Sequence, residues 1–340
     1  MFGKLPVRLL ILLLLCSTLI ICKKKETPPE EVTEEIAVQE EEKQEDENLP
    51  EKAKSSGAHV SYLTQRPKQG LSAIGGRVNT GEINPINYEN PDINVLKQMG
   101  AEPAIISFFT GEQYYKAGDY NKALIEYNAS ISHNGEFTEA LTARGNTWLK
   151  KGEYKRAIDD YSRAIRIDGK RAELYNYRGY ARAELAELKS AIEDYSLALA
   201  INSNYTDALI NRSYALFEIG EYGRVIEDCT RIIALEPKNV YAWNRRGSAL
   251  YSLGDDDKAI KDFSEAIKLR DNYAPAWHNR GNAWYSKGDL DKALADINRA
   301  LAINPSYADA YTSRGNILRL LGNNESAASD FSSAQRLKQR

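Results

Sequence analysis

Residues 274–307 read APAWHNRGNAWYSKGDLDKALADINRALAINPSY, and this stretch decides the fold. Apolar residues three or four apart lie on both sides of Gly288, a spacing that places side chains on one face of a helix. Gly allows the left-handed backbone that ends a helix, and Asp289 is a favoured first cap for the next one. The stretch therefore predicts a helix, a tight turn and a second helix.

The same unit recurs every 34 residues without a gap. We call the units repeats 1 to 7; they span residues 104–137, 138–171, 172–205, 206–239, 240–273, 274–307 and 308–340. A fixed period of this length is typical of a solenoid, in which each repeat packs only on its neighbours. Positions within a repeat are numbered 1 to 34.

Small and bulky residues recur in phase. Position 8 is Gly in six repeats and position 24 is mostly aromatic, so we expect the two to interlock. Repeat 4 has Ser213 and Cys229 there instead, and we expect Cys229 to be a core residue. Position 15 is Gly in six repeats and Ala186 in repeat 3, and it marks the turn between the two helices.

These recurring positions resemble the tetratricopeptide repeat (TPR) family. Its pattern W-x2-L-G-x2-Y occurs here as Trp277-His-Asn-Arg-Gly281-Asn-Ala-Trp284 and as Leu141-Thr-Ala-Arg-Gly145-Asn-Thr-Trp148, whereas the family's Pro at position 32 is present only as Pro237 and Pro305. The resemblance covers residues 104–340. It implies an all-α, right-handed superhelical solenoid of seven helix-turn-helix repeats, preceded by a disordered tether.

Charged residues also recur in phase. Position 7 is Arg in repeats 2 to 7, and position 23 is acidic in every repeat. Both lie eight residues from the turn at position 15, so they face each other across the antiparallel helix pair. We expect six Arg–Asp pairs. A carboxylate that recurs in step is structural, because a catalytic group would occur once.

The last repeat differs as the end of a stack should. Position 28 is apolar in six repeats and becomes Gln335, and position 21 changes from Leu or Ile to Ala328. Terminal repeats need a polar outer face, so we expect these two residues to face water.

Residues 1–22 form a predicted signal peptide or membrane anchor. Lys4 and Arg8 precede an apolar run that fits a secretory signal better than a full bilayer span. The run resembles a bacterial lipoprotein signal in which Cys22 is lipidated, although Ile21 departs from the small residue that this signal places before its Cys. An uncleaved anchor, an ordinary signal peptide, and Cys22 as a plain apolar residue stay open. We expect a membrane-anchored protein facing the periplasm or the cell exterior.

Residues 23–103 form a predicted acidic, flexible linker. Residues 26–54 carry twelve acids against three Lys and no aromatic residue. Such a segment cannot bury enough apolar surface to offset its ordering entropy.

A candidate peptide-binding face follows from the first helix of each repeat. Positions 2, 5, 9 and 12 share one helix face, which in the TPR family lines a groove that holds extended peptides. Asn can pair with a peptide backbone and Tyr supplies contact area at low entropic cost. The candidate residues are Phe108, Tyr115, Asn146, Asn176, Tyr180, Tyr214, Phe217, Tyr241, Asn244, Arg245, Tyr251, His278, Asn282, Tyr285 and Asn316. The alternative for several Tyr is packing between repeats.

Charge narrows the expected partner. This face carries more acids than bases, and only Asn211 with Arg245 resembles the clamp with which some TPR proteins grip a C-terminal carboxylate. The acids are Glu112, Glu139, Glu173, Asp207, Glu218 and Asp309; the bases are Lys116, Lys150 and Arg319. We therefore expect extended peptide segments that are neutral or mildly basic.

Other classes of function lack their sequence signatures. The three His are far apart and no C-x-x-C occurs, so we expect no metal and no cofactor. Neither G-x-S-x-G nor G-x-G-x-x-G occurs, so we expect no enzyme. The net charge after residue 54 is only +1, too low for a nucleic-acid surface.

The sequence thus predicts a non-enzymatic adaptor or scaffold of the cell envelope that binds other proteins. The alternative is an accessory subunit that positions substrate for an envelope-modifying enzyme complex.

Overall fold

The computed structural model describes residues 92–98 and 100–339, and the regular structure in these ranges is entirely helical. A short helix, α4 (Ile93–Gln98), precedes the repeats. The helices of repeats 1 to 7 are α5 (Pro103–Lys116), α6 (Tyr120–His133), α7 (Thr138–Lys150), α8 (Tyr154–Ile167), α9 (Ala172–Glu184), α10 (Leu188–Ile201), α11 (Thr206–Glu218), α12 (Tyr222–Leu235), α13 (Val240–Ser252), α14 (Asp256–Leu269), α15 (Ala274–Ser286), α16 (Leu290–Ile303), α17 (Ala308–Leu320) and α18 (Asn324–Lys338).

The predicted signal or anchor at 1–22, Cys22 itself and linker residues 23–91 lie outside the described residues. Within the part that the structure describes, no helix has the length and apolar character needed to cross a membrane.

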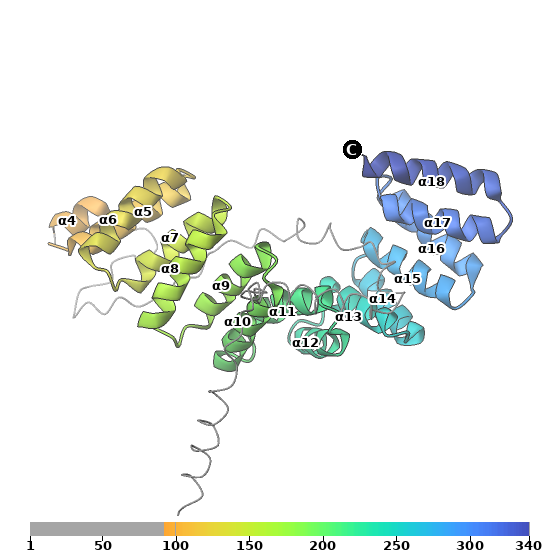
Figure 1. Cartoon of the computed structure of the whole chain (residues 1–340), viewed down its shortest axis with the longest axis horizontal. Coiled ribbons are helices and arrows are strands. Elements are labelled where there is room, and N and C mark those ends of the chain that lie inside the picture. Colours follow the sequence, from red (N-terminus) through yellow and green to blue (C-terminus); the bar gives the residue numbers. More distant parts are fainter. Residues whose placement is uncertain (1–91, 99, 340) are drawn as a thin grey trace, which may run out of the picture. The chain divides into compact units, whose positions relative to one another are not determined.

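Each repeat is a pair of helices that stacks on the next pair (Figure 1). The second helix of a repeat packs between the first helix of its own repeat and that of the following one. First helices also contact each other directly, as α9 contacts α11 and α13 contacts α15. The first helices therefore form a continuous row, and their side chains make up what we call the first-helix face.

The turn inside each repeat is left-handed at position 15, as expected. Six Gly there have φ of 74–83°, and Ala186 holds φ at 62° in repeat 3. Asp289 accepts a hydrogen bond from the backbone N–H of Lys292 and so caps α16. Asp119, Asp255 and Asn323 cap their helices in the same way.

Positions 8 and 24 interlock, as predicted. A Cβ added to Gly145 would lie 2.7 Å from Cε1 of Tyr161, and the Gly at position 8 of five other repeats have equally close neighbours at position 24. Ser213 and the buried Cys229 replace this pair in repeat 4 and bond to each other. The smaller Cys leaves room for the larger Ser, and Cys229 is a core residue as expected.

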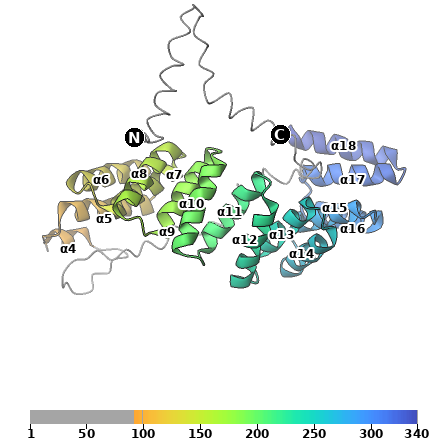
Figure 2. The ribbon, with the colours of Figure 1, turned by 60° about the horizontal axis from the view of Figure 1, so that its bottom comes forward.

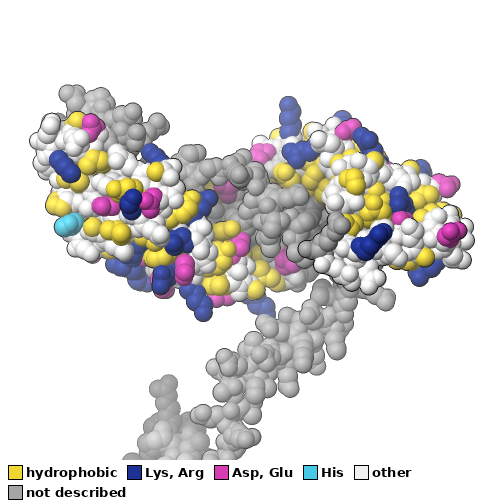
Figure 3. Space-filling model, turned by 90° about the horizontal axis from the view of Figure 1, so that it is seen from above, with side chains coloured by type: hydrophobic (Ala, Val, Ile, Leu, Met, Phe, Trp, Pro, Cys, Tyr) yellow, Lys and Arg dark blue, Asp and Glu magenta, His cyan; other side chains and the backbone are white. Residues whose placement is uncertain are grey.

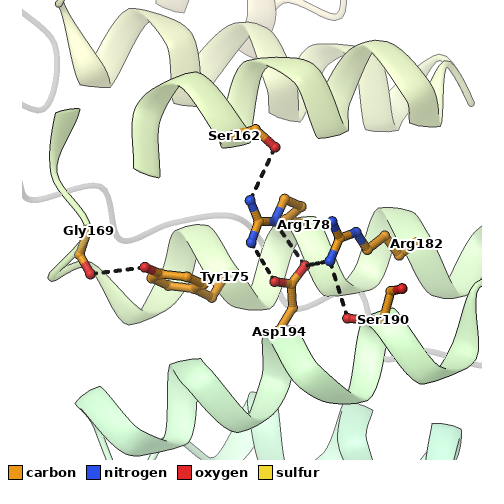
Figure 4. A network of polar contacts seen from close by, with 7 residues as sticks. All are labelled: Ser162, Gly169, Tyr175, Arg178, Arg182, Ser190 and Asp194. Atoms are coloured by element: carbon orange, nitrogen blue, oxygen red, sulfur yellow. Dashed lines mark hydrogen bonds and ion pairs between the residues drawn. The ribbon is translucent and has the colours of Figure 1, made fainter. Parts of the chain in front are cut away.

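All six predicted Arg–Asp pairs form. Each Arg donates through Nε and Nη2 to both carboxylate oxygens at 2.6–3.0 Å. In repeat 3 the pair is Arg178 with Asp194, and Arg182 adds a further bond of 3.0 Å to the same carboxylate (Figure 4). These pairs join the two helices of one repeat.

The same Arg also reaches the preceding repeat. Arg178 donates through Nη1 to Oγ of Ser162 at 3.2 Å (Figure 4). The corresponding acceptors for the other five Arg, at 2.6–3.1 Å, are Asn128, Ser196, Thr230, Ser264 and Asn298. All six lie at position 25, which is always a small hydroxyl or amide residue, so the sequence held this signal although we did not predict the contact.

The two ends of the array are covered differently (Figure 2). Ala328 and Gln335 of α18 are exposed, as expected for a terminal repeat. At the other end α4 packs on α5 and buries Leu96 to 4% exposure. The chain is therefore folded from Ile93, inside the range predicted as linker, because Ile93 and Leu96 give one turn of helix an apolar face.

Candidate functional site

All fifteen candidate peptide-binding residues lie on first helices, so the fold brings them to one row of helices. They differ in accessibility. Six are buried and act inside the protein: Phe108, Asn146, Asn176, Phe217, Asn244 and His278. The other nine are half-buried or exposed: Tyr115, Tyr180, Tyr214, Tyr241, Arg245, Tyr251, Asn282, Tyr285 and Asn316.

The buried Asn side chains fasten neighbouring first helices to each other. Asn211 on α11 donates to Oδ1 of Asn176 on α9 at 3.0 Å. Asn279 on α15 donates in the same way to Oδ1 of Asn244 on α13 at 3.1 Å. The acceptor is at position 5 and the donor at position 6 of the next repeat. Sequence reasoning assigned Asn176 and Asn244 to peptide contact and missed this pairing.

Asn146 and Phe108 are also internal. Asn146 accepts a hydrogen bond of 2.7 Å from the hydroxyl of Tyr161. The ring of Phe108 packs against Phe109 and Phe137 at centroid distances of 5.1 and 5.2 Å. Both residues therefore support the first-helix face from beneath.

His278 joins repeat 6 to repeat 7. Its Nε2 lies 3.0 Å from Oγ of Ser313 and its Nδ1 lies 3.1 Å from the hydroxyl of Tyr307. Burial lowers the pKa of His278 to about 4, against a smaller opposing effect of Asp309. The imidazole is thus neutral at neutral pH and serves as a hydrogen-bonding link between repeats.

The more accessible Tyr side chains are positioned by the adjacent repeat. The hydroxyl of Tyr241 accepts from Nη1 of Arg270 at 3.0 Å, and that of Tyr251 lies 3.2 Å from Oγ of Ser286. Tyr285 is 37% exposed. Rings held in this way need little further ordering when they meet a ligand.

The contact between repeats 4 and 5 differs from its neighbours. Here position 5 is Ile210, so no amide pair can form, and position 6 is Arg245. The guanidinium of Arg245 lies 3.4 Å from the ring centre of Tyr214 and 5.4 Å from that of Phe217. A cation stacked on aromatic rings replaces the buried amide bond at this point.

Many acids of the first-helix face have partners within the protein. Arg171, at position 34 of repeat 2, pairs with Glu139 at 3.3 Å and with Glu173 at 2.8 Å. Asp309 pairs with Lys338 at 3.0 Å. The excess of acids counted from sequence therefore overstates the charge that a partner would meet. Acidic and basic side chains are also interspersed on the face seen in Figure 3.

Two perturbed groups carry no chemistry that we can assign. Burial, with Tyr120 and Glu112 nearby, raises the pKa of Tyr115 to about 12. Burial likewise raises the pKa of the Cys229 thiol to about 12, which keeps it from acting as a thiolate. Among the described residues no group of three His, Cys, Asp or Glu could hold a metal ion.

Comparison with known proteins agrees with this fold. The family model described as tetratricopeptide repeat matches residues 240–273 and 274–307, and a model described as TPR repeat matches residues 145–185. No curated protein sequence matches the chain.

Solved structures similar to this chain are themselves TPR proteins. A tetratricopeptide repeat protein from Parabacteroides merdae ATCC 43184 is 21% identical with a TM-score of 0.57, covering 70% of this chain and 94% of that one. YrrB, described as a TPR protein with an unusual peptide-binding site, is 22% identical with a TM-score of 0.50, covering 54% and 95%. PilF of Pseudomonas aeruginosa is 19% identical with a TM-score of 0.51, covering 59% and 91%. The described repeats are therefore a TPR solenoid.

Proposed function

We propose that this TPR solenoid is a non-enzymatic adaptor whose first-helix face holds an extended peptide segment of another protein. Stacked repeats offer long surfaces of the kind that protein-binding scaffolds use. The observation that carries the proposal is the set of half-buried Tyr and Asn side chains on consecutive first helices, several of them positioned by the next repeat. Such side chains suit an extended chain with unpaired backbone groups.

The partner segment is neutral or mildly basic. Pairing of Glu139, Glu173 and Asp309 within the protein lowers the effective negative charge of the face, which favours the neutral end of that range. A carboxylate-gripping clamp is disfavoured because Asn211 donates its amide to Asn176.

The location at the cell envelope rests on the sequence of residues 1–22 and 23–91. We propose lipidation at Cys22, a linker that holds the repeats away from the membrane, and exposure to the periplasm or the cell exterior. Mass analysis of the intact protein tests the anchor: an unprocessed Met1 would rule out the lipoprotein.

Site-specific photocrosslinking tests the proposed binding face. A photoreactive amino acid replaces the exposed Tyr285 of the full chain, and crosslinked peptides are identified by mass spectrometry. The matched control carries the same group at Tyr311, whose ring instead stacks near Arg314 of its own helix at 5.4 Å. Capture of several unrelated segments by the first variant alone supports an adaptor. Equal capture by both variants contradicts a binding role for this face.

The same experiment separates the alternative. An accessory subunit of an envelope-modifying enzyme complex would give one abundant enzyme partner in place of several unrelated segments.

A further inference from the structure

Four consecutive repeats each place one partly accessible Tyr on the first-helix face. They are Tyr180, Tyr214, Tyr251 and Tyr285 of repeats 3 to 6. The first two are at position 9 and the last two at position 12, which lie three residues apart and therefore on one side of a helix. We call these four residues the tyrosine row.

The spacing of the row follows from helix packing. Helices α9 and α11 are in contact, as are α13 and α15, and Arg245 of α13 reaches the ring of Tyr214 on α11. Packed helices lie about 8–10 Å apart. The row therefore presents one aromatic ring for roughly every 8–10 Å along the face.

A polyproline II helix has the matching period. It rises about 3.1 Å per residue with three residues per turn, so every third side chain points the same way after about 9.3 Å. In a β-strand the side chains on one face recur after about 6.6 Å, which does not fit this spacing. We propose that the tyrosine row recognises a proline-rich polyproline II segment with Pro at every third position. This inference rests on the peptide-binding function proposed above.

The chemistry of the row suits such a segment. Proline rings can pack on Tyr rings, and aromatic surfaces are a recurring way to bind polyproline II chains. A polyproline II chain makes no internal hydrogen bonds, so its carbonyls need donors. Tyr hydroxyls and the guanidinium of Arg245, held on the ring of Tyr214 at 3.4 Å, supply them. The partial neutralisation of the face by Arg171 is compatible with an uncharged ligand.

Two peptides of equal composition test the register. The first is a fluorescein-labelled peptide of five Pro-Ala-Gln units, with Pro at every third position. The second contains five Pro-Ala units followed by five Gln, with Pro at every second position. Fluorescence anisotropy with the full chain in detergent measures both dissociation constants. We expect the first peptide to bind about tenfold more tightly, which corresponds to about 1.4 kcal/mol.

Substitutions in the row locate the binding. Tyr285→Ala and Tyr251→Ala should each weaken binding of the first peptide by about five- to tenfold. Tyr311→Ala, which removes a Tyr outside the row, should leave binding unchanged. Circular dichroism of each variant verifies the helical content, and the peptide comparison on the unaltered chain does not depend on any variant.

Each outcome decides the inference. Equal affinity for the two peptides would overturn the polyproline II register while leaving peptide binding in place. Loss of binding in the Tyr311 variant as large as in the Tyr285 variant would overturn the role of the row. Absence of binding by both peptides would also overturn the inference, whereas the proposed function would still be judged by the crosslinking at Tyr285.

Discussion

Arg178 and Asp194 form a two-bond ion pair, with Nε to Oδ2 at 3.0 Å and Nη2 to Oδ1 at 2.7 Å, and the carboxylate side chain is only 1% exposed. The third donor of the same guanidinium bonds Ser162 in the preceding repeat. One side chain therefore connects three helices. Because this arrangement recurs in repeats 2 to 7, it joins the helices within each of these repeats and links each one to its predecessor.

Removing one carboxylate of these pairs should be costly. Asp262→Ala leaves the half-buried guanidinium of Arg246 without its two bonds, and breaking a buried pair costs about 3–5 kcal/mol. Urea unfolding followed by circular dichroism measures the loss. The control is Asp257→Ala, whose carboxylate is 75% exposed and should contribute at most about 1 kcal/mol. Equal effects of the two substitutions would contradict a structural role for the pair.

The turn of repeat 3 should gain stability from a Gly. Ala186 holds φ at 62°, a conformation that costs a residue with a Cβ about 1 kcal/mol or more. We expect Ala186→Gly to raise the free energy of unfolding by about 1 kcal/mol. Ala295→Gly, an exposed site within α16, should lower it by about as much. A thermal melt of both variants measures this, and a loss of stability at position 186 would refute the strain argument.

The packing of positions 8 and 24 should be testable by copying repeat 4 into repeat 5. Gly247→Ser places a Cβ 2.7 Å from Phe263 and should cost about 1–3 kcal/mol. Adding Phe263→Cys reproduces the Ser213 and Cys229 combination. In a double-mutant cycle measured by urea unfolding, the double variant should lose less stability than the sum of the single ones. Strict additivity would show that the two positions do not interlock.

The buried imidazole of His278 should make stability pH-dependent. Its folded pKa of about 4 lies below the ordinary value of 6.5, so the unfolded chain binds the proton more readily between these values. The contribution is fully present above pH 6.5 and is lost as pH falls towards 4, by about 3 kcal/mol in total.

Urea titrations from pH 7 to pH 4 measure this dependence. His278→Gln should flatten it relative to the unaltered chain, whereas replacing the exposed His133 by Gln should leave it unchanged. An unaltered pH slope in the His278 variant would show that the imidazole does not carry the effect.

Much of the repeat itself could be predicted because its determinants are close in sequence. Gly288 and Asp289 are adjacent, and Arg280 and Asp296 lie at equal distances from the turn between their helices. The short helix α4 was missed because it has a single turn and only two apolar residues, too few for a periodic signal.

The candidate site was only partly predictable. Position and residue type placed Asn176, Asn244 and His278 on the first-helix face, but the structure buries all three. Burial depends on the offset between neighbouring first helices, which no pattern within one repeat encodes.

The sequence by itself determined the number of repeats, the turns and the pairing within each repeat, because these depend on short-range geometry that is copied every 34 residues. Only the tertiary structure decided which polar side chains join repeats and which remain accessible. It also showed that Arg171 pairs with Glu139 and Glu173, because ion pairs between repeats form only once the helices are stacked.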